Sequence, residues 1–338
     1  MPLRLTQVPR HDARTEARRL ITSLHEPHPR MPLHASLDWR AAELQHRLAH
    51  ALPGVQVRVQ GSVDSTNTRL LDEARSALRF EPTLLVAETQ TAGRGRHGRT
   101  WRSSLERSLT FSLALPMQRT DLSGLSLAVG VALADALDAP GRTVGPRIGL
   151  KWPNDLWLVG AHADERPQAE DIRRPRPEGD EQSGKATFAH ETEAGRKLGG
   201  VLIETAQRGA QRTVIVGVGL NVSPLDIADA RSGVGSLSEL DPHWSAPGVL
   251  HAVASPLALA LVRFDDEGFA PFAARFVARD LLRGRAVSAG NVHGIADGIA
   301  AGGALRVRGT DGVQTIVSGE VSIDLRPALD AALPLRAC

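Results

Sequence analysis

Two lysines lie in short segments whose composition suggests an anion-binding site. The chain has 338 residues and 40 lysines plus arginines, and three of these are lysines: Lys151, Lys185 and Lys197. Arginine presents a wide planar fork and lysine a compact ammonium, so a retained lysine indicates a pocket too narrow for a guanidinium. We therefore predict that Lys151, in KWPNDL, and Lys197, in RKLGGVLIE, contact a carboxylate or phosphate. Lys185, in a polar segment, is interpreted as a solvated cation.

A second set of cations lies in GRGRHGRTW, residues 93–101, called the arginine loop below. Its glycines let the backbone approach a ligand closely, and Arg94, Arg96 and Arg99 offer guanidiniums suited to phosphate or carboxylate oxygens. Trp101 is interpreted as sealing a pocket or stacking on a base. The loop has neither the GxxxxGK[ST] pattern nor GxGxxG spacing, which excludes an ordinary P-loop and a Rossmann fingerprint. From composition alone, a solvated loop or an Arg-Gly nucleic-acid patch remains the alternative.

Two polar clusters complete the candidate chemistry. Asp64-Ser65-Thr66-Asn67 precedes an amphipathic run and predicts a capped helix start, whose free N–H groups and hydroxyls can serve a ligand or simply the cap. Pro153-Asn154-Asp155 predicts a turn that ends a strand. That turn would place Lys151, Asn154 and Asp155 at one edge of a sheet.

Hydrophobic periodicity predicts the elements that position these clusters. Strands are expected at 55–59, 83–87, 109–115, 148–152, 197–205 and 213–221. Helices are expected over 38–50, after the 64–67 cluster and through Leu78, over 122–137 and over 247–282, the last broken at Gly268 or Pro271. From Arg285 onward, short apolar runs separated by Gly and Asp predict a small all-β domain.

Length and composition set the domain organisation. The length indicates about two or three domains, which we place at residues 1–35 (a flexible extension), 36–282 (the main domain, with a disordered insert at 160–196) and 283–330. An apolar content of 42% and a net charge of +2 are typical of a soluble globular protein. The single cysteine, Cys338, permits no internal disulfide and fits a reducing cytoplasm. No apolar run is expected to approach the roughly 20 residues of a membrane span.

Five motifs in order resemble one family, the biotin protein ligases. They are DSTN at 64–67, ETQTAGRGRHGRTW at 88–101, KWPNDL at 151–156, KLGGVLIE at 197–204 and GVGLNV at 217–222. The likeness covers residues 60 to 326 without the insert. It implies an α+β fold, in which a mixed β-sheet with helices, related to class II aminoacyl-tRNA synthetases, is followed by a C-terminal SH3-like β-barrel.

The resemblance also implies a reaction and a set of site residues. Biotin and ATP would give biotinoyl-AMP and pyrophosphate, and biotin would then pass to a lysine of a biotin carboxyl carrier protein. The expected catalytic residues are Lys197, Arg94 and Arg96. Biotin would bind at Ser65, Thr66, Asn67, Gln90, Arg94, Gly95, Arg96, Lys197 and Gly200, ATP at Arg99, Trp101, Lys151, Asn154 and Asn221, and Mg²⁺ or a water at Asp155.

Some features depart from the family pattern or leave alternatives open. His97 stands where an arginine is common, which would weaken anion contacts or introduce pH sensitivity, and Arg326 comes too late to be assigned to ATP. Residues 1 to 60 predict one helix where a repressor-ligase carries a winged helix-turn-helix, so we expect a cytoplasmic ligase without DNA binding, monomeric or homodimeric. The rivals are a DNA-binding, biotin-responsive repressor and a lipoate or octanoate ligase on the related fold.

Overall fold

The computed structural model describes residues 37–139, 147–159, 195–225 and 233–323. The predicted extension at residues 1–35, nearly all of the predicted insert at 160–196, and Arg326 lie outside this part of the chain. The boundaries proposed for these segments therefore stay predictions.

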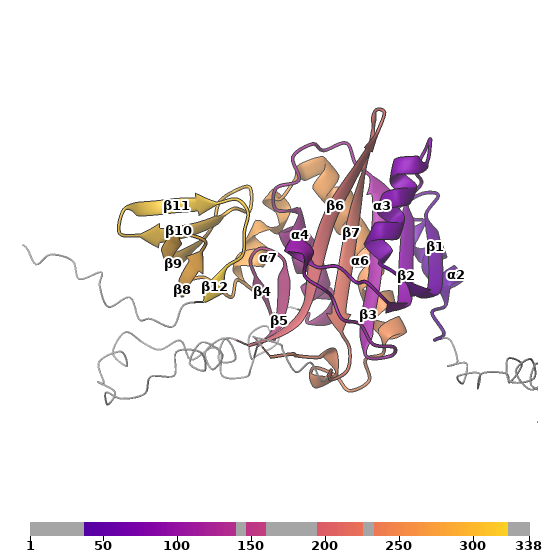
Figure 1. The fold of residues 1–338 in the computed structure, drawn as a ribbon, viewed down its shortest axis with the longest axis horizontal. Helices are drawn as coiled ribbons and strands as arrows, with labels where there is room; N and C mark the ends of the chain where they lie inside the picture. The colour runs from indigo at the N-terminus through magenta and orange to yellow at the C-terminus, as the bar shows by residue number, and fades with distance from the viewer. Residues whose placement is uncertain (1–36, 140–146, 160–194, 226–232, 324–338) are drawn as a thin grey trace, which may run out of the picture. The chain divides into compact units, whose positions relative to one another are not determined.

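A mixed seven-stranded sheet forms the larger domain, in the order β1-β2-β3-β7-β6-β5-β4 (Figure 1). The first pair, β1 and β2, is parallel, and every other neighbouring pair is antiparallel. The strands span Gln56–Val63 (β1), Thr83–Gln90 (β2), Ser108–Pro116 (β3), Ile148–Lys151 (β4), Asp155–Leu158 (β5), Arg196–Arg208 (β6) and Gln211–Asn221 (β7). The long β6–β7 hairpin confirms the strands predicted at 197–205 and 213–221, whereas β5, which begins at the last residue of the predicted 153–155 turn, was not predicted.

Every second residue of β3 and β7 carries a large apolar side chain, which gives the sheet one apolar face. On β7, Val214, Val216, Val218 and Leu220 all belong to the main hydrophobic core. Side chains on a strand alternate between faces, so the intervening residues point the other way. Those residues include Ser112 on β3, which pairs with Gly217 on β7, so the second face becomes small and polar near one end.

Helices cover both faces of this sheet. α2 (Ala41–Leu48), α4 (Leu125–Leu137) and α6 (Ala246–Glu267) pack into the main core, with α7 (Ala273–Val277) beside α4. α3 (Thr66–Ser76) covers the second face over a smaller apolar cluster that contains Ala114, Ala206 and Ile215. Ser65 caps α3, since its side chain accepts a hydrogen bond from Thr68 N, as the sequence predicted.

The long helical region near the C-terminus breaks where glycine permits it. α6 ends at Gly268, whose φ of 72° belongs to the left-handed region. Contrary to the sequence expectation, α6 is long and apolar enough to cross a membrane by length and composition. However, its buried side chains, including Leu257 and Phe264, lie in the main core. A buried core helix can have the same length and apolar composition as a membrane span.

Residues 286–323 form the predicted small all-β domain. Its five strands, β8 (Ala286–Ala289), β9 (Val292–Ile299), β10 (Leu305–Gly309), β11 (Gly312–Ile316) and β12 (Ser322–Ile323), make an antiparallel sheet in the order β11-β10-β9-β8-β12. The indole of Trp152, at the end of β4, donates to Gly303 O at 2.9 Å. The mixed sheet with helices and the added all-β domain confirm the predicted α+β fold class.

Candidate functional site

A cavity of about 280 Å³ opens on the polar face of the large sheet. Its floor consists of small residues in register on neighbouring strands: Gly200 pairs with Gly219, and Gly219 pairs with Thr110. One step along, Gly217 lies between Leu202 and Ser112. These small residues leave room for a ligand where side chains would otherwise fill the space.

One end of the cavity, called the polar end below, is a network of hydrogen bonds built on the start of α3. Gln90 Oε1 accepts from Thr66 N at 2.8 Å and from the Thr66 hydroxyl at 3.2 Å. Ser112 Oγ lies 2.7 Å from Thr66 Oγ1 and 2.6 Å from Asn67 Oδ1. Ser65, Thr66 and Asn67 are each 3% exposed, so these polar groups keep fixed orientations for a polar ligand.

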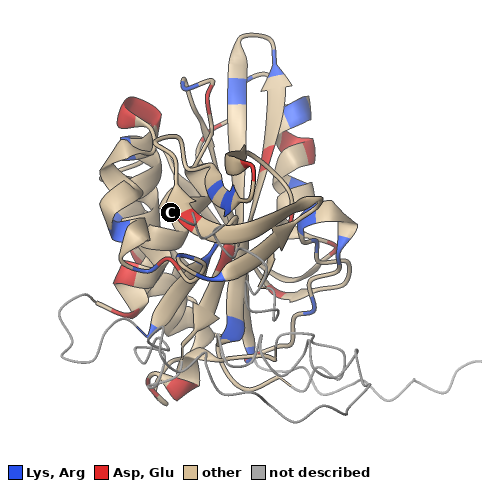
Figure 2. Cartoon of the chain, turned by 90° about the vertical axis from the view of Figure 1, so that its left-hand side faces the viewer, with Lys and Arg blue, Asp and Glu red and all other residues tan. Residues whose placement is uncertain are grey.

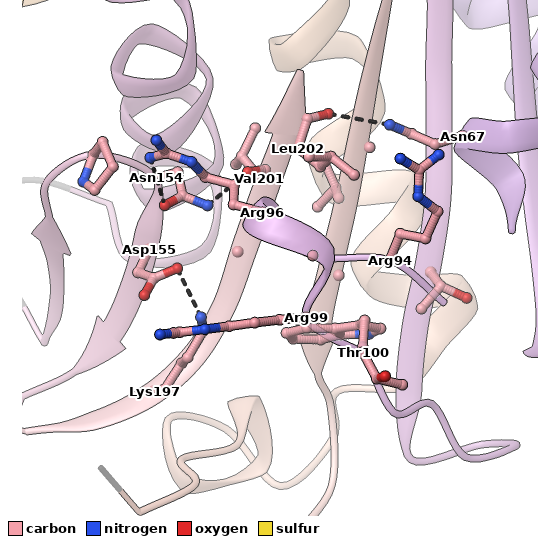
Figure 3. A pocket seen from close by; sticks show the side chains of 18 of the residues that line it. Asn67, Arg94, Arg96, Arg99, Thr100, Asn154, Asp155, Lys197, Val201 and Leu202 are labelled. Atoms are coloured by element: carbon pink, nitrogen blue, oxygen red, sulfur yellow. Dashed lines mark hydrogen bonds and ion pairs between the residues drawn. The ribbon is translucent and has the colours of Figure 1, made fainter. Parts of the chain in front are cut away.

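The arginine loop crosses the cavity (Figure 3), and its three guanidiniums have different partners. Arg94 forms an ion pair with Glu204, and Arg99 forms one with Glu320 of the small domain. Arg96 donates to Asn154 Oδ1 at 3.4 Å, and no carboxylate of the described residues lies within ion-pair distance of it. Burial lowers the pKa of the Arg96 guanidinium, a shift that the nearby charges of Asp155 and Glu320 oppose. Arg96 is therefore the loop cation best placed to meet an anionic ligand.

A β-bulge directs Lys197 into the cavity. Gly199 pairs with Leu156, but Lys197 pairs with Trp157, so Leu198 is the extra residue. In a strand without a bulge, Lys197 and Gly200 would point to opposite faces, because they are three positions apart. With it, Lys197 Nζ lies 2.8 Å from Asp155 Oδ1, on the cavity side (Figure 3).

Two large aromatic side chains line the same end of the cavity as the lysines. The ammonium of Lys151 stands 4.6 Å from the ring centroid of Trp157, and Lys151 is 9% exposed. Trp101 packs so closely on the floor that a Cβ at Gly219 would lie 2.5 Å from Trp101 Cε2. Its indole Nε1 is buried and has no hydrogen-bond partner within the described structure, so a bound molecule could accept that hydrogen.

The cavity lining contains almost all of the residues predicted from the sequence. Those residues are Ser65, Thr66, Asn67, Gln90, Arg94, Gly95, Arg96, Arg99, Trp101, Lys151, Asn154, Asp155, Lys197 and Gly200. Asn221 is different, because it is buried and its amide donates to Lys197 O and Gly235 O, each at 3.2 Å. It supports the backbone beside Lys197 and is not part of the lining.

His97 and three further residues refine the sequence interpretation. His97 is exposed, has a φ of 53° and is not among the lining residues, so its imidazole is poorly placed to affect anion contacts. Ser112, Glu204 and Glu320 take part in the network and were not predicted. Ser112 could have been found from the hydroxyl between Phe111 and Leu113. Glu204 ends the KLGGVLIE motif, but its partners, like those of Glu320, could not be assigned without the fold.

A preformed metal centre is not evident in the described residues. They contain no group of three or more His, Cys, Asp or Glu side chains able to hold an ion. The carboxylates that line the cavity, Asp155 and Glu320, are each engaged by a cation. Asp155 has a second oxygen that could still serve a metal or a water.

Comparison with known proteins places this site in context. A model of the "Biotin/lipoate A/B protein ligase family" matches residues 59–221, and one of the "Biotin protein ligase C terminal domain" matches residues 284–324. The chain is 29% identical over 275 residues to the biotin--[acetyl-CoA-carboxylase] ligase of Paracoccus denitrificans, covering 76% of this chain and 96% of that protein. It is 27% identical over 281 residues to the bifunctional ligase/repressor BirA of Escherichia coli, covering 80% of this chain and 75% of BirA.

A solved structure supports the same comparison. The biotin protein ligase of Aquifex aeolicus, in complex with biotin and ATP, superimposes with a TM-score of 0.59 at 27% identity. The match covers 79% of this chain and 98% of that one.

Proposed function

The chain belongs to the biotin protein ligase family, and we propose that its cavity activates biotin with ATP and then transfers biotin to a lysine of a biotin carboxyl carrier protein. The observation that carries the proposal is the division of one cavity into a neutral polar end, with Thr66, Asn67 and Gln90, and a cationic end, with Arg96 and Lys197. Biotin has the same division, between a neutral ureido ring and a carboxylate. The relative solved with biotin and ATP supports the assignment of both substrates.

The first step joins two anions, which the cationic end is suited to promote. A carboxylate oxygen of biotin attacks the α-phosphorus of ATP, the bond to the bridging oxygen breaks, and pyrophosphate leaves. Lys197 and Arg96 would stabilise charge on the carboxylate and the α-phosphate as they approach. Asp155, at 2.8 Å, keeps the ammonium of Lys197 oriented before substrate arrives.

The second step consumes the mixed anhydride formed by the first. The amine of the carrier lysine attacks the acyl carbon, AMP leaves, and the amide nitrogen loses a proton. The arginine loop lies across the cavity and would shield the anhydride from water until the carrier binds. Trp101 and Lys151 would contact the nucleotide, the former through its ring and its unpartnered Nε1.

Magnesium fits this site only as a partner of the nucleotide. The described residues hold no cluster of three ligating side chains, and of the two carboxylates that line the cavity Asp155 is the one beside Lys197. This suits an ion that keeps several waters and binds mostly through phosphates. When bound, Mg²⁺ would neutralise phosphate charge. Asn154 and Asp155 are the residues we expect nearest to it.

A direct assay tests the proposed function. Purified protein is incubated with ATP, an apo-carrier domain and either labelled biotin or labelled lipoate. We expect label on the carrier from biotin and background labelling from lipoate. Transfer from lipoate alone would replace this proposal with the lipoate ligase alternative.

The repressor alternative concerns an additional activity of a ligase. One relative is a bifunctional ligase/repressor, but residues 37–63 contribute only α2 and β1 to the described structure. Figure 2 shows basic and acidic segments interspersed on the side of the molecule facing the viewer, without a continuous basic stripe there. We therefore propose a ligase that does not bind DNA, and a steeply salt-dependent operator shift would contradict this. On the sequence alone we also propose that it is cytoplasmic and monomeric or homodimeric.

A further inference from the structure

Glu204 is a carboxylate in an apolar position that the reaction described above does not use. It pairs with Ile215 across the β6–β7 hairpin, and Ile215 belongs to the apolar cluster beneath α3. Its side chain is 17% exposed. A charge at the border of an apolar cluster loses hydration, so it persists there only with good partners. The two partners of Glu204 therefore indicate what its charge is for.

The first partner is Asn67, a buried residue of the polar end. Asn67 Nδ2 donates to Glu204 Oε2 at 2.9 Å. The other side of the amide is held by Ser112, and a Cβ at Gly217 would lie 2.3 Å from Asn67 Oδ1. The amide oxygen is therefore confined by the strands beneath it. Asn67 Nδ2 also donates to Leu202 O at 3.4 Å, but its shorter, charge-assisted bond is the one to Glu204.

The second partner is Arg94, the first arginine of the arginine loop. Arg94 Nη2 lies 3.2 Å from Glu204 Oε1. Figure 3 shows the Arg94 side chain beside Asn67, whereas Arg96 extends toward Asn154. The charge of Arg94 is therefore neutralised by the sheet, and this residue is a tether for the loop more than a free cation for the reacting phosphate.

We propose that Glu204 is a positioning residue that couples the polar end of the cavity to the arginine loop, by holding Asn67 with one carboxylate oxygen and Arg94 with the other. The proposal rests on the proposed function, since it concerns the loop that covers the acyl-adenylate. The described loop has three other side-chain contacts: a 3.5 Å hydrogen bond from Arg94 to the Thr68 hydroxyl, the bond from Arg96 to Asn154, and the ion pair of Arg99 with Glu320 of the small domain. The tether at Glu204 is the one that reaches the residues expected to hold the ureido ring, so it should act on biotin more than on ATP.

Glu204→Gln isolates the charge of the pair. The amide can still accept from Asn67, but it no longer attracts the guanidinium of Arg94. We expect the KM for biotin and the rate of acyl-adenylate escape into solution to rise about three- to fivefold, the scale of one partly exposed ion pair. The KM for ATP should change less than twofold. Glu73→Gln, which breaks the Arg58–Glu73 pair away from the cavity, is the matched control and should leave all three quantities unchanged.

A double-mutant cycle with Arg94→Gln completes the test. If the two residues act as a pair, the double variant should be no worse than the poorer single variant, and Arg94→Lys should retain the adenylate better than Arg94→Gln. The proposal would be overturned if the fold-changes of the two single variants multiplied in the double variant. It would also be overturned if an active Glu204→Gln protein kept the wild-type biotin KM and rate of acyl-adenylate escape. If thermal melting shows that Glu204→Gln does not fold, the test is the rate of acyl-adenylate escape from Arg94→Lys compared with Arg94→Gln. Equal escape rates from these two variants would overturn the proposal. Absence of biotin transfer by the wild-type chain would instead refute the proposed function.

Discussion

The ammonium of Lys197 is held at one point on the cavity side of β6, where its Nζ contacts Asp155 at 2.8 Å. Lys197→Arg keeps the charge but replaces this compact ammonium with a larger planar fork, which cannot place its charge at the same point. We expect biotin-dependent exchange of pyrophosphate into ATP to fall about 10- to 100-fold. Lys197→Met should be comparably impaired, and near-normal exchange by the arginine variant would refute the argument from size.

Gly219 controls the position of Trp101. A Cβ at Gly219 would lie 2.5 Å from the indole, so Gly219→Ala must displace the ring. Overpacking of this kind costs about 1–3 kcal/mol, and we expect the KM for ATP to rise about fivefold or more. Gly61→Ala is a suitable control, because the nearest atom to its added Cβ would be 3.9 Å away. An ATP KM equal to that of the control would show that Trp101 does not contact the nucleotide.

The junction between α7 and β8 carries a buried carboxylate, Asp280, whose ionisation makes stability depend on pH. Leu150 N donates to Arg279 O at 2.7 Å, which joins this segment to the large sheet. Next to it, Asp280 Oδ1 accepts from Leu282 N, but Oδ2 is buried with no partner in the described structure. Burial raises the pKa of Asp280 to about 6 from 3.8, although backbone hydrogen bonds and the charge of Arg283 oppose the rise.

The sign of the resulting pH dependence follows from this raised pKa. The folded protein holds the proton more tightly than the unfolded chain, so the contribution of Asp280 to stability is greatest below pH 3.8 and declines as pH rises to about 6. Asp280→Asn should remove that decline and raise the free energy of unfolding at pH 8 by at most about 3 kcal/mol. Urea unfolding of both proteins at pH 5 and pH 8 measures this. A gain that is the same at both pH values, or a loss at pH 8, would contradict the assignment.

Prediction from sequence succeeded where one local rule was enough. Alternating valines predicted β7, and the polar cluster before an amphipathic run predicted the Ser65 cap. It failed where pairing decides the outcome: β5 is only four residues long and exists because it pairs with β4 and β6. The bulge at Leu198 and the contacts of Glu204 likewise depend on register between strands distant in sequence. The order of the motifs could locate the cavity, but it could not show which of the arginines there are already paired with a carboxylate.

At the scale of the whole molecule, the small domain supplies part of the cavity. Glu320, Val321 and Ser322 line it, and Glu320 pairs with Arg99 of the arginine loop. The two domains meet closely at Gly303, whose carbonyl accepts from the Trp152 indole. A Cβ at Gly303 would lie 2.8 Å from Gly124 Cα, which leaves no space for a side chain between the domains.

Gly303→Ala should therefore separate the small domain from the cavity. The backbone of Gly303 has a φ of 82°, so an alanine there is strained as well as obstructed. Gly298→Ala separates these effects, because Gly298 has a φ of 81° in the same domain and nothing within 4 Å of the added Cβ. We expect both variants to lose a similar amount of stability from strain, but only Gly303→Ala to expose residues 278–285 to protease and to raise the KM for ATP about fivefold or more, as overpacking of ~1–3 kcal/mol implies. Equal protease sensitivity and equal ATP KM in the two variants would mean that docking of the small domain does not support nucleotide binding.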